Sequence, residues 1–448
     1  MLVLALPMML TQVSQMGMGI ADSMMAGRVS ATDLAGVALG GNFFWPALLL
    51  LSGTIMSLTP TVSQLHGGGR EKEAGEVVRQ AFYVVLAGGG LMVLFLNSVE
   101  PLYHLLGVDP RAIPIAVDYL HAVSFGVVPL LGYFAMRFLC EGLSWTLPAM
   151  LIALSALLLK IPLNYLFIYG GFGIEPMGGV GCGWASVLVM WYQLLAIIAV
   201  VSMSRISKVG VFARFSPPDF TAIIRLIRLG LPIGLTVFLE MSMFSVVTLM
   251  IGRLGVEAVA AHQIAASVGG MTFMVPLALG MAASIRVGFN VGAGNLAAAR
   301  RSGWIAIGVS LVFALFAAMV VFYSRPWLAG LYSTELEVIS LATDLLIFVV
   351  LFQFFDDAQV TAVGALRGFK DTRVPMWIAM FSYWAIGLPV GATLAFGWLD
   401  GAVFDAYAGV RGFWVGLLAG LGCAALILVT RFHWLSSREQ HILAYASR

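Results

Sequence analysis

Apolar stretches long enough to cross a lipid bilayer recur along the whole chain, and no other feature restricts its possible folds as strongly. A helix needs about 20 apolar residues to span the hydrocarbon core. Of the 448 residues, 60% are hydrophobic and only 10% are charged, whereas soluble globular proteins carry about 25% charged residues. The chain is therefore predicted to be an integral membrane protein.

Apolar windows bounded by charges, glycine and proline predict twelve spans, which places both termini on one side of the membrane. Eighteen of the 24 Lys and Arg residues fall on that side, five fall on the other, and Lys160 lies within a span. Because basic residues favour the cytoplasmic side, we expect a multi-pass protein of the cytoplasmic (inner) membrane with both termini in the cytoplasm. The predicted spans lie near residues 2–25, 36–60, 77–98, 113–137, 147–169, 180–203, 229–251, 258–284, 302–323, 338–364, 374–397 and 410–430.

The two halves of the sequence resemble each other at an offset of 225 residues, beginning with LALP (4–7) and LGLP (229–232). Each half holds six predicted spans. Since six is an even number, both copies enter the membrane in the same orientation, as in transporters whose repeats are related by an axis along the membrane normal. We therefore expect an all-α fold with two pseudo-symmetric six-helix lobes, residues 1–203 and 225–448, around a central cavity that opens alternately to each side.

Residues 204–224 are predicted to join the lobes. They contain most of the longest polar stretch, RISKVGVFARFSPPDF, which is typical of a basic cytoplasmic linker lying along the membrane surface. Ser216 followed by Pro217 predicts a helix N-cap with proline at the first helical position. The second copy begins with the basic segment RLIRLGLP (225–232), whereas the first begins abruptly at Met1. We therefore expect a short basic leader to precede the first copy.

Among the carboxylates within the predicted spans we single out four: Asp22, Glu240, Asp356 and Asp357. A carboxylate in the hydrocarbon region costs at least a few kcal/mol, so it usually faces a cavity and serves a function. In the repeat alignment Glu240 matches Gln15 and Asp22 matches a valine, so each lobe acquired its own acids. The alternative is that these acids only satisfy buried donors or cap a broken helix. Four acids with almost no basic residue available to neutralise them favour the functional interpretation.

Helical spacing gives these acids polar neighbours. Gln15 shares one stripe of its helix with Asp22. Gln353 lies four residues before Asp357 and Thr361 lies four residues after it. We therefore expect hydrogen-bonding partners on the same helix face as each acid.

Lys160 lies near the middle of a predicted span, away from both ends, and Asn164 lies on the same helix face four residues further on. One interpretation is a lysine that extends toward the membrane interface. The other is that Lys160 faces Asp22 across the first lobe and neutralises it, forming a polar network with Asn164. That pairing would make the Asp22 site less suitable for a metal cation.

The walls of the expected cavity are adaptable, because the chain has 23 methionines and 12% aromatic residues. Methionine suits surfaces that bind many shapes, and an aromatic face can hold a cation. Acids with such walls predict a site for lipophilic cations, with Phe238 and Phe355 as candidate drug contacts. A carboxylate that takes up a proton no longer attracts a cationic drug, so proton and drug would compete. Sodium could act in the same way with oxygen ligands.

Three stretches together carry a specific resemblance that extends over essentially the whole chain. The sequence resembles the multidrug and toxic compound extrusion (MATE) transporters, in particular the NorM branch. The resemblance implies twelve spans, two six-helix lobes and export of organic cations against sodium or protons. The stretches are LALPMMLTQVSQMGMGIADSMMAGRVSATDLAGVAL (4–39), LGLPIGLTVFLEMSMFSVVTLMIGRLG (229–255) and DDAQVTAVGALRGFKDTRVPM (356–376).

The resemblance also implies roles for individual residues. Asp22 matches the first-lobe acid, and Glu240 and Asp356 match acids that take part in cation coupling, so all three are candidate coupling residues. Glu240 and Asp356 would be the metal ligands if the ion is sodium. Asp356 and Asp357 resemble an acidic pair that contacts drug. Gln15 and Gln353 are polar neighbours of these acids and join the candidate drug site. Asn164 matches a first-lobe polar residue. Lys160 departs from the pattern, which has Asn there, and this favours protons.

Two other function classes are less consistent with the sequence. A lipid-linked precursor flippase of the same superfamily would have a basic cavity, and an intramembrane protease would carry Gly-Asp signatures. We therefore expect a transporter rather than an enzyme, with no cofactor, no nucleic-acid partner and a monomeric state. Cys140, Cys182 and Cys423 are expected to be free thiols. The sequence leaves the coupling ion, its stoichiometry and the range of substrates open.

Overall fold

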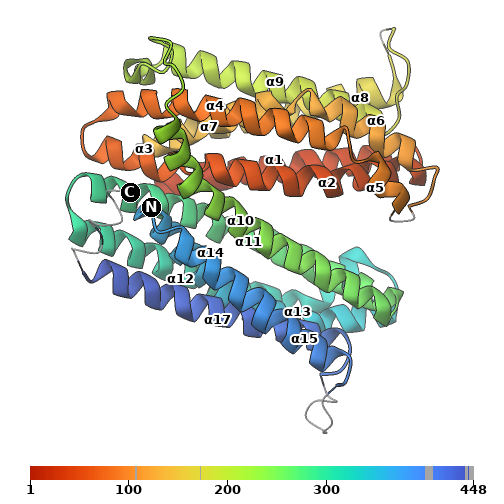
Figure 1. The fold of residues 1–448 in the computed structure, drawn as a ribbon. Coiled ribbons are helices and arrows are strands. Elements are labelled where there is room, and N and C mark those ends of the chain that lie inside the picture. Colours follow the sequence, from red (N-terminus) through yellow and green to blue (C-terminus); the bar gives the residue numbers. More distant parts are fainter. Residues whose placement is uncertain (106–107, 172, 399–406, 439–441, 443–448) are drawn as a thin grey trace. The chain divides into compact units, whose positions relative to one another are not determined.

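The computed structural model describes residues 1–448 except 106–107, 172, 399–406, 439–441 and 443–448, and helices make up most of the described chain (Figure 1). The helices of the first half are α1 (Leu2–Gly27), α2 (Ala31–Ile55), α3 (Leu58–Gly67), α4 (Glu71–Leu96), α5 (Glu100–Leu105), α6 (Ile113–Ser124), α7 (Val127–Gly142), α8 (Leu147–Tyr169), α9 (Val180–Met203) and the short 3-10 helix η1 (Arg205–Val209). Those of the second half are α10 (Phe220–Ile251), the 3-10 helix η2 (Gly252–Leu254), α11 (Val256–Gly292), α12 (Leu296–Tyr332), α13 (Leu336–Gly368), α14 (Arg373–Met380), the π-helix η3 (Phe381–Gly387), α15 (Leu388–Ala395) and α17 (Val410–Ser436).

The predicted number of spans is confirmed. Within the described residues, eleven helical segments are long and apolar enough to cross a membrane, and α6 with α7 forms a twelfth span that is bent by 49°. The bend lies where the chain passes α9 closely. A Cβ atom on Gly126 would lie 2.4 Å from Met190 Sδ and 3.3 Å from the Cα atom of Val187, so a larger residue here would require the Met190 side chain to move. The structure is therefore an all-α polytopic membrane protein.

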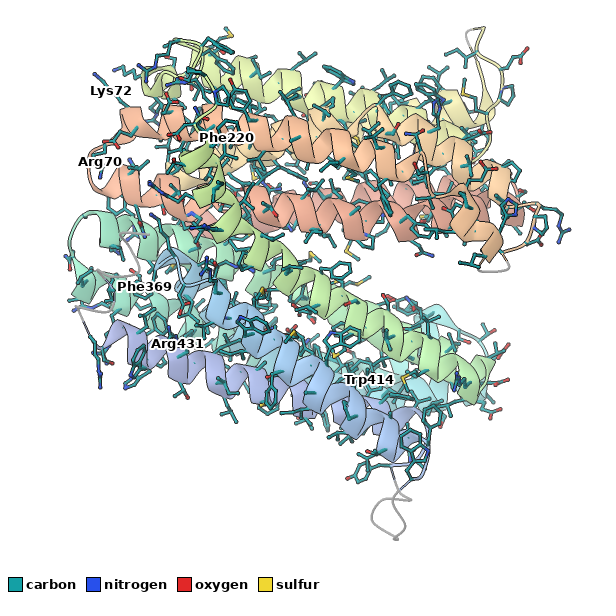
Figure 2. The ribbon with its side chains drawn as sticks, in the orientation of Figure 1. Arg70, Lys72, Phe220, Phe369, Trp414 and Arg431 are labelled. Atoms are coloured by element: carbon teal, nitrogen blue, oxygen red, sulfur yellow. The ribbon has the colours of Figure 1, made fainter. Side chains whose placement is uncertain are left out.

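The chain divides into two compact units, which we call the N-terminal unit (Leu6–Gly234) and the C-terminal unit (Met1–Ala5 with Leu235–Arg448). Each has its own apolar core. In the C-terminal unit, Phe369 and Trp414 lie among the helices with at most 2% of their surface exposed (Figure 2).

The internal repeat is visible in where the helices begin. The helices α2, α4 and α8 begin at Ala31, Glu71 and Leu147. Their counterparts α11, α12 and α14 begin at Val256, Leu296 and Arg373, which lie 225, 225 and 226 residues further along the chain. The repeated sequence therefore folds into a repeated series of helices.

The two long helices α11 and α13 approach each other closely through a pair of glycines. A Cβ atom on Gly364 would lie 2.1 Å from the carbonyl oxygen of Gly280, which is backbone and cannot move aside as a side chain can. Since α13 carries the adjacent aspartates, this contact sets how closely the acids approach α11.

We expect Gly364→Ala to destabilise the protein, because overpacking a close helix contact costs about 1–3 kcal/mol. The measurement is the thermal unfolding midpoint of the purified protein in detergent. Gly308→Ala is the matched control, since a Cβ atom at that helical glycine meets nothing within 4 Å. Equal midpoints for the two variants would contradict the assigned contact.

The start of α10 differs from the prediction. The expected helix start at Ser216 and Pro217 is wrong, because α10 begins at Phe220. Asp219 caps it, accepting a hydrogen bond at Oδ1 from the backbone N–H of Thr221 at 2.8 Å. The hydroxyl group of Ser216 is engaged elsewhere, because it donates to Glu76 Oε2 at 2.8 Å, so it is not free to cap a helix.

Candidate functional site

The C-terminal unit brings two acids from different helices to one cavity. Glu240 on α10 and Asp356 on α13 both line a cavity of about 220 Å³. Its other lining residues are mostly apolar or aromatic: Met241, Phe244, Ala266, Gly269, Gly270, Phe273, Val349, Phe352 and Trp414. Two carboxylates that face one apolar space repel each other unless a proton or another cation neutralises them. The cavity therefore has the chemistry of a cation site.

Asp356 has an unsatisfied oxygen. Its side chain is buried, with 5% of the residue exposed, and Oδ1 has no hydrogen-bond partner among the described residues. Leaving a buried polar atom unpaired costs free energy, and more so for a charged group. One carboxylate oxygen of a residue that lines the cavity thus has no protein partner, and a proton, a metal ion or a cationic ligand would satisfy it.

Asp357 points away from this cavity, because neighbouring residues of a helix project about 100° apart. Ser310 on α12 donates a hydrogen bond to Asp357 Oδ2 at 3.3 Å. The adjacent acids are thus divided between two environments, the cavity for Asp356 and the α12 contact for Asp357.

The partners predicted for Asp357 from helical spacing are wrong. Gln353 instead donates to the hydroxyl of Thr272 on α11 at 2.6 Å. Thr361 donates to the backbone carbonyl of Asp357 and not to its carboxylate. A threonine in a helix commonly bonds to the carbonyl four residues before it, which explains the second difference.

The candidate aromatic contacts lie outside the cavity lining. Phe238 and Phe355 are each 37% exposed. The aromatic lining comes from Phe244, Phe273 and Phe352, and from Trp414 on α17. Trp414 did not emerge from the sequence, since it lies more than fifty residues from Asp356 and Asp357 and shares no motif with them.

In the N-terminal unit, the predicted ion pair between Lys160 and Asp22 is present. Lys160 Nζ lies 3.0 Å from Asp22 Oδ1, and Asn164 donates to the same oxygen at 2.7 Å. The ammonium group also contacts the carbonyl oxygen of Cys182 at 3.2 Å and the hydroxyl of Ser186. Only 1% of Lys160 is exposed, which excludes a side chain extended to the membrane interface in this structure.

This ion pair borders a second cavity, of about 90 Å³. Gln15, Asp22 and Lys160 contribute polar groups to it, among aromatic residues and methionines that include Phe44, Trp45, Tyr119, Phe134, Met18 and Met190. Asp22 has a lysine ammonium group at ion-pair distance, whereas Asp356 in the other unit has no ion-pair partner among the described residues. The two units therefore differ in charge at their acids.

A further buried charged pair was missed. Arg137 Nε donates to Glu141 Oε1 at 2.6 Å on α7, and Arg137 Nη2 reaches Gln12 Oε1 of α1 at 3.1 Å. The two charged residues are at most 2% exposed. Sequence reasoning counted Arg137 among basic residues outside the membrane. The spacing of four residues between opposite charges was the available signal.

No group of three or more His, Cys, Asp or Glu side chains that could hold a metal ion occurs among the residues the structure describes. Cys140, Cys182 and Cys423 are free thiols, as predicted.

Comparison with known proteins identifies the family. The MatE family model matches residues 7–166 and 232–393. The chain therefore belongs to the MatE family, which confirms the resemblance to multidrug and toxic compound extrusion transporters.

Curated relatives match nearly the whole chain. A probable multidrug resistance protein NorM of Xanthomonas campestris pv. campestris is 42% identical over 436 residues, covering 97% of this chain and 93% of the relative. Multidrug resistance protein PmpM of Pseudomonas aeruginosa is 43% identical over 433 residues, covering 96% and 90%. Multidrug resistance protein MdtK of Yersinia pseudotuberculosis is 40% identical over 439 residues, covering 98% and 95%.

Solved structures show the same fold. The crystal structure of the eukaryotic MATE transporter AtDTX14 matches with a TM-score of 0.87 at 20% identity, covering 100% of this chain and 97% of that chain. An outward-facing multidrug resistance MATE family transporter of the MOP superfamily also gives 0.87, at 19% identity, covering 100% and 96%. The predicted all-α transporter fold is thus confirmed.

Proposed function

We propose that this protein is a secondary active multidrug efflux antiporter of the inner membrane, which exports lipophilic organic cations in exchange for protons or sodium by alternating access. The observation that carries the proposal is the buried Asp356 carboxylate, whose Oδ1 has no hydrogen-bond partner among the described residues, on a residue that lines an aromatic cavity together with Glu240. The relatives named as multidrug resistance proteins support the same assignment. In this proposal the protein acts as a monomer, with both termini in the cytoplasm.

The exchange follows from competition for negative charge. An ionised carboxylate attracts an organic cation, and an aromatic wall adds a favourable contact for the cation. Once a proton or sodium ion neutralises the acid, that attraction is lost and the drug is released. Glu240, Asp356 and Asp22 are the proposed coupling residues, and for sodium Glu240 and Asp356 would supply the oxygen ligands.

The Lys160–Asp22 pair favours protons over sodium in the first lobe, because a fixed ammonium group repels a metal cation beside the same carboxylate. We propose that the residues that contact drug are Asp356, Asp357, Asp22, Gln15, Gln353, Phe238 and Phe355. The proposed moving parts are the lobes of residues 1–203 and 225–448, joined by the linker of residues 204–224.

Dye efflux from vesicles with separately imposed gradients tests this function. The purified protein is reconstituted with a fluorescent lipophilic cation, and either a proton or a sodium gradient is applied. We expect the proton gradient alone to drive efflux, because the only acid in the N-terminal cavity already has a cation beside it. Efflux that requires sodium would move coupling to Glu240 and Asp356 as metal ligands and contradict the preference for protons. Efflux under neither gradient would contradict antiport and favour the flippase.

A further inference from the structure

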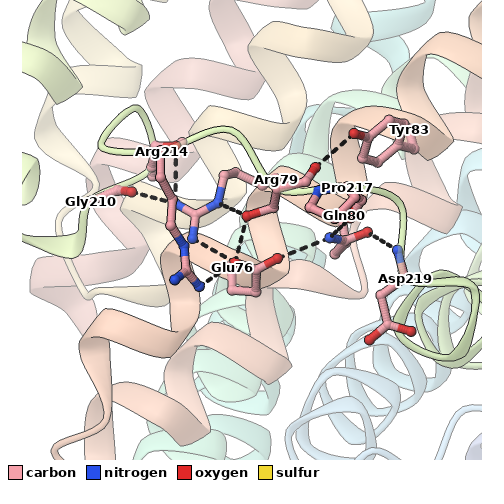
Figure 3. Close-up of polar contacts among 10 residues, drawn as sticks. Glu76, Arg79, Gln80, Tyr83, Gly210, Arg214, Pro217 and Asp219 are labelled. Atoms are coloured by element: carbon pink, nitrogen blue, oxygen red, sulfur yellow. Dashed lines mark hydrogen bonds and ion pairs between the residues drawn. The ribbon is translucent and has the colours of Figure 1, made fainter.

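The segment that follows α9 is held against α4 by a network of polar contacts, shown in Figure 3. Arg79 donates to the carbonyl oxygen of Gly210 and to the hydroxyl of Ser216, the latter at 2.9 Å. Glu76 accepts hydrogen bonds from Arg79, Ser216 and Arg214. We call these contacts, with the two described next, the linker clamp.

Two further side chains of α4 extend the linker clamp to the start of α10. Gln80 donates to the carbonyl of Pro217 and accepts from the backbone N–H of Asp219, at 2.9 and 2.8 Å. The hydroxyl of Tyr83 donates to the carbonyl of Ser216 at 2.7 Å. Because these bonds satisfy backbone groups along residues 210–219, the segment has one defined face toward α4 and one away from it.

The face away from α4 is aromatic and basic. Phe212, Phe215 and Phe220 are 52%, 87% and 72% exposed. Three exposed phenylalanines within nine residues are unfavourable in water, because large apolar side chains are normally buried there. Four exposed basic residues belong to the same region, Arg205, Lys208, Arg225 and Arg228, whereas Arg214 pairs with Glu76 of α4 in the linker clamp. Glu76, the acid of the linker clamp, accepts the hydrogen bond from Ser216 on the side of the segment that faces α4.

We propose that this aromatic and basic face binds the anionic headgroups of the adjoining membrane leaflet. The segment runs directly from one membrane-spanning helix to the next, since α9 ends at Met203 and α10 begins at Phe220, so the bilayer is within reach along its whole length. Clusters of basic residues beside a span attract anionic lipids, and aromatic rings insert at the headgroup boundary. An anionic phospholipid therefore complements both features of this face: its headgroup suits the basic residues, and its apolar part suits the phenylalanines.

The linker clamp fixes the conformation of this face before lipid binds to it. A free linker would lose conformational entropy each time it bound lipid, whereas this one is already fixed by α4. The inference does not depend on the transported substrate or on the coupling ion.

The test measures which lipid surrounds position 215. Phe215→Cys is labelled with a bimane fluorophore, and the full protein is reconstituted in mixed phosphatidylcholine and phosphatidylglycerol, with bromine on the acyl chains of one lipid or the other. Unsubstituted protein, labelled in parallel, corrects for its three native cysteines. Leu94→Cys serves as the comparison site, because Leu94 is 67% exposed on the apolar part of α4.

At position 215, we expect brominated phosphatidylglycerol to quench the label more strongly than brominated phosphatidylcholine at equal content. At position 94, we expect the two brominated lipids to quench the label equally. Adding Lys208→Gln or Arg225→Gln should lower the preference by about two- to five-fold each, and high salt should lower it further. Arg28→Gln, an exposed basic residue at the far end of α1, should leave it unchanged.

Two outcomes would overturn the proposal. Equal quenching by both lipids at position 215 would mean that the phenylalanines enter the bilayer without selecting anionic headgroups. No quenching by either lipid would mean that the face is turned to water or to a protein. Both readouts are independent of transport, so they remain informative if the proposed antiport fails.

Discussion

Asp356→Asn is expected to reduce dye efflux at least ten-fold while leaving the fold intact. The substitution keeps the size of the side chain and removes the charge that faces the cavity with Glu240. A unit charge about 4 Å from a cation is worth about 4 kcal/mol at an effective dielectric constant of 20, and each 1.4 kcal/mol is a factor of ten in affinity. The measurement is the initial rate of efflux from vesicles, with the thermal midpoint recorded for the same preparation.

Asp344→Asn is the matched control, because it makes the same chemical change on the same helix, α13. Asp344 is half-exposed and pairs with Arg411, and such pairs contribute little. We expect it to retain most of the efflux. If Asp356→Asn keeps more than half of the efflux, or if Asp344→Asn loses as much, the assignment of Asp356 is wrong.

Lys160→Met is expected to lower the free energy of unfolding by about 3 kcal/mol, since removing one partner of a buried ion pair leaves the other charge uncompensated. Asp22 would keep only the hydrogen bond from Asn164, and its carboxylate would remain mostly buried. The thermal unfolding midpoint in detergent measures the loss. Lys72→Met, at an exposed lysine in the first turn of α4, should change it little.

A second variant separates the ion pair from the packing of the lysine chain. Asp22→Asn combined with Lys160→Met removes both charges, and replacing a whole buried pair is often neutral. We therefore expect the double variant to recover most of the lost stability. A double variant no more stable than Lys160→Met would show that the aliphatic part of Lys160, rather than its charge, is what matters.

The number and approximate bounds of the spans followed from the sequence because hydropathy alone decides what crosses a bilayer. Hydropathy does not reveal where a span breaks. At the bend between α6 and α7, Gly126 lies against Met190, which is more than sixty residues away in the sequence. The Lys160–Asp22 pair was also predictable, because each side chain carries a charge that needs a partner in an apolar environment.

The details of the sites depended on tertiary structure. Adjacent aspartates on a helix must face different neighbours, yet nothing in the chain around Asp356 and Asp357 says which one faces the cavity. Trp414 reaches that cavity from a helix with no sequence relation to either acid. The linker clamp pairs Glu76 and Arg79 with residues about 130 positions away, so hydrophobic periodicity and local spacing do not reveal it.

The division of the chain has a consequence for biosynthesis. Every residue of the N-terminal unit precedes Leu235, so this unit and its linker clamp can assemble while the ribosome is still making the remainder, as domains generally fold in order of synthesis. The C-terminal unit cannot complete its folding in the order of synthesis. It includes Met1–Ala5, so these residues complete their packing only after the second half of the chain has been made.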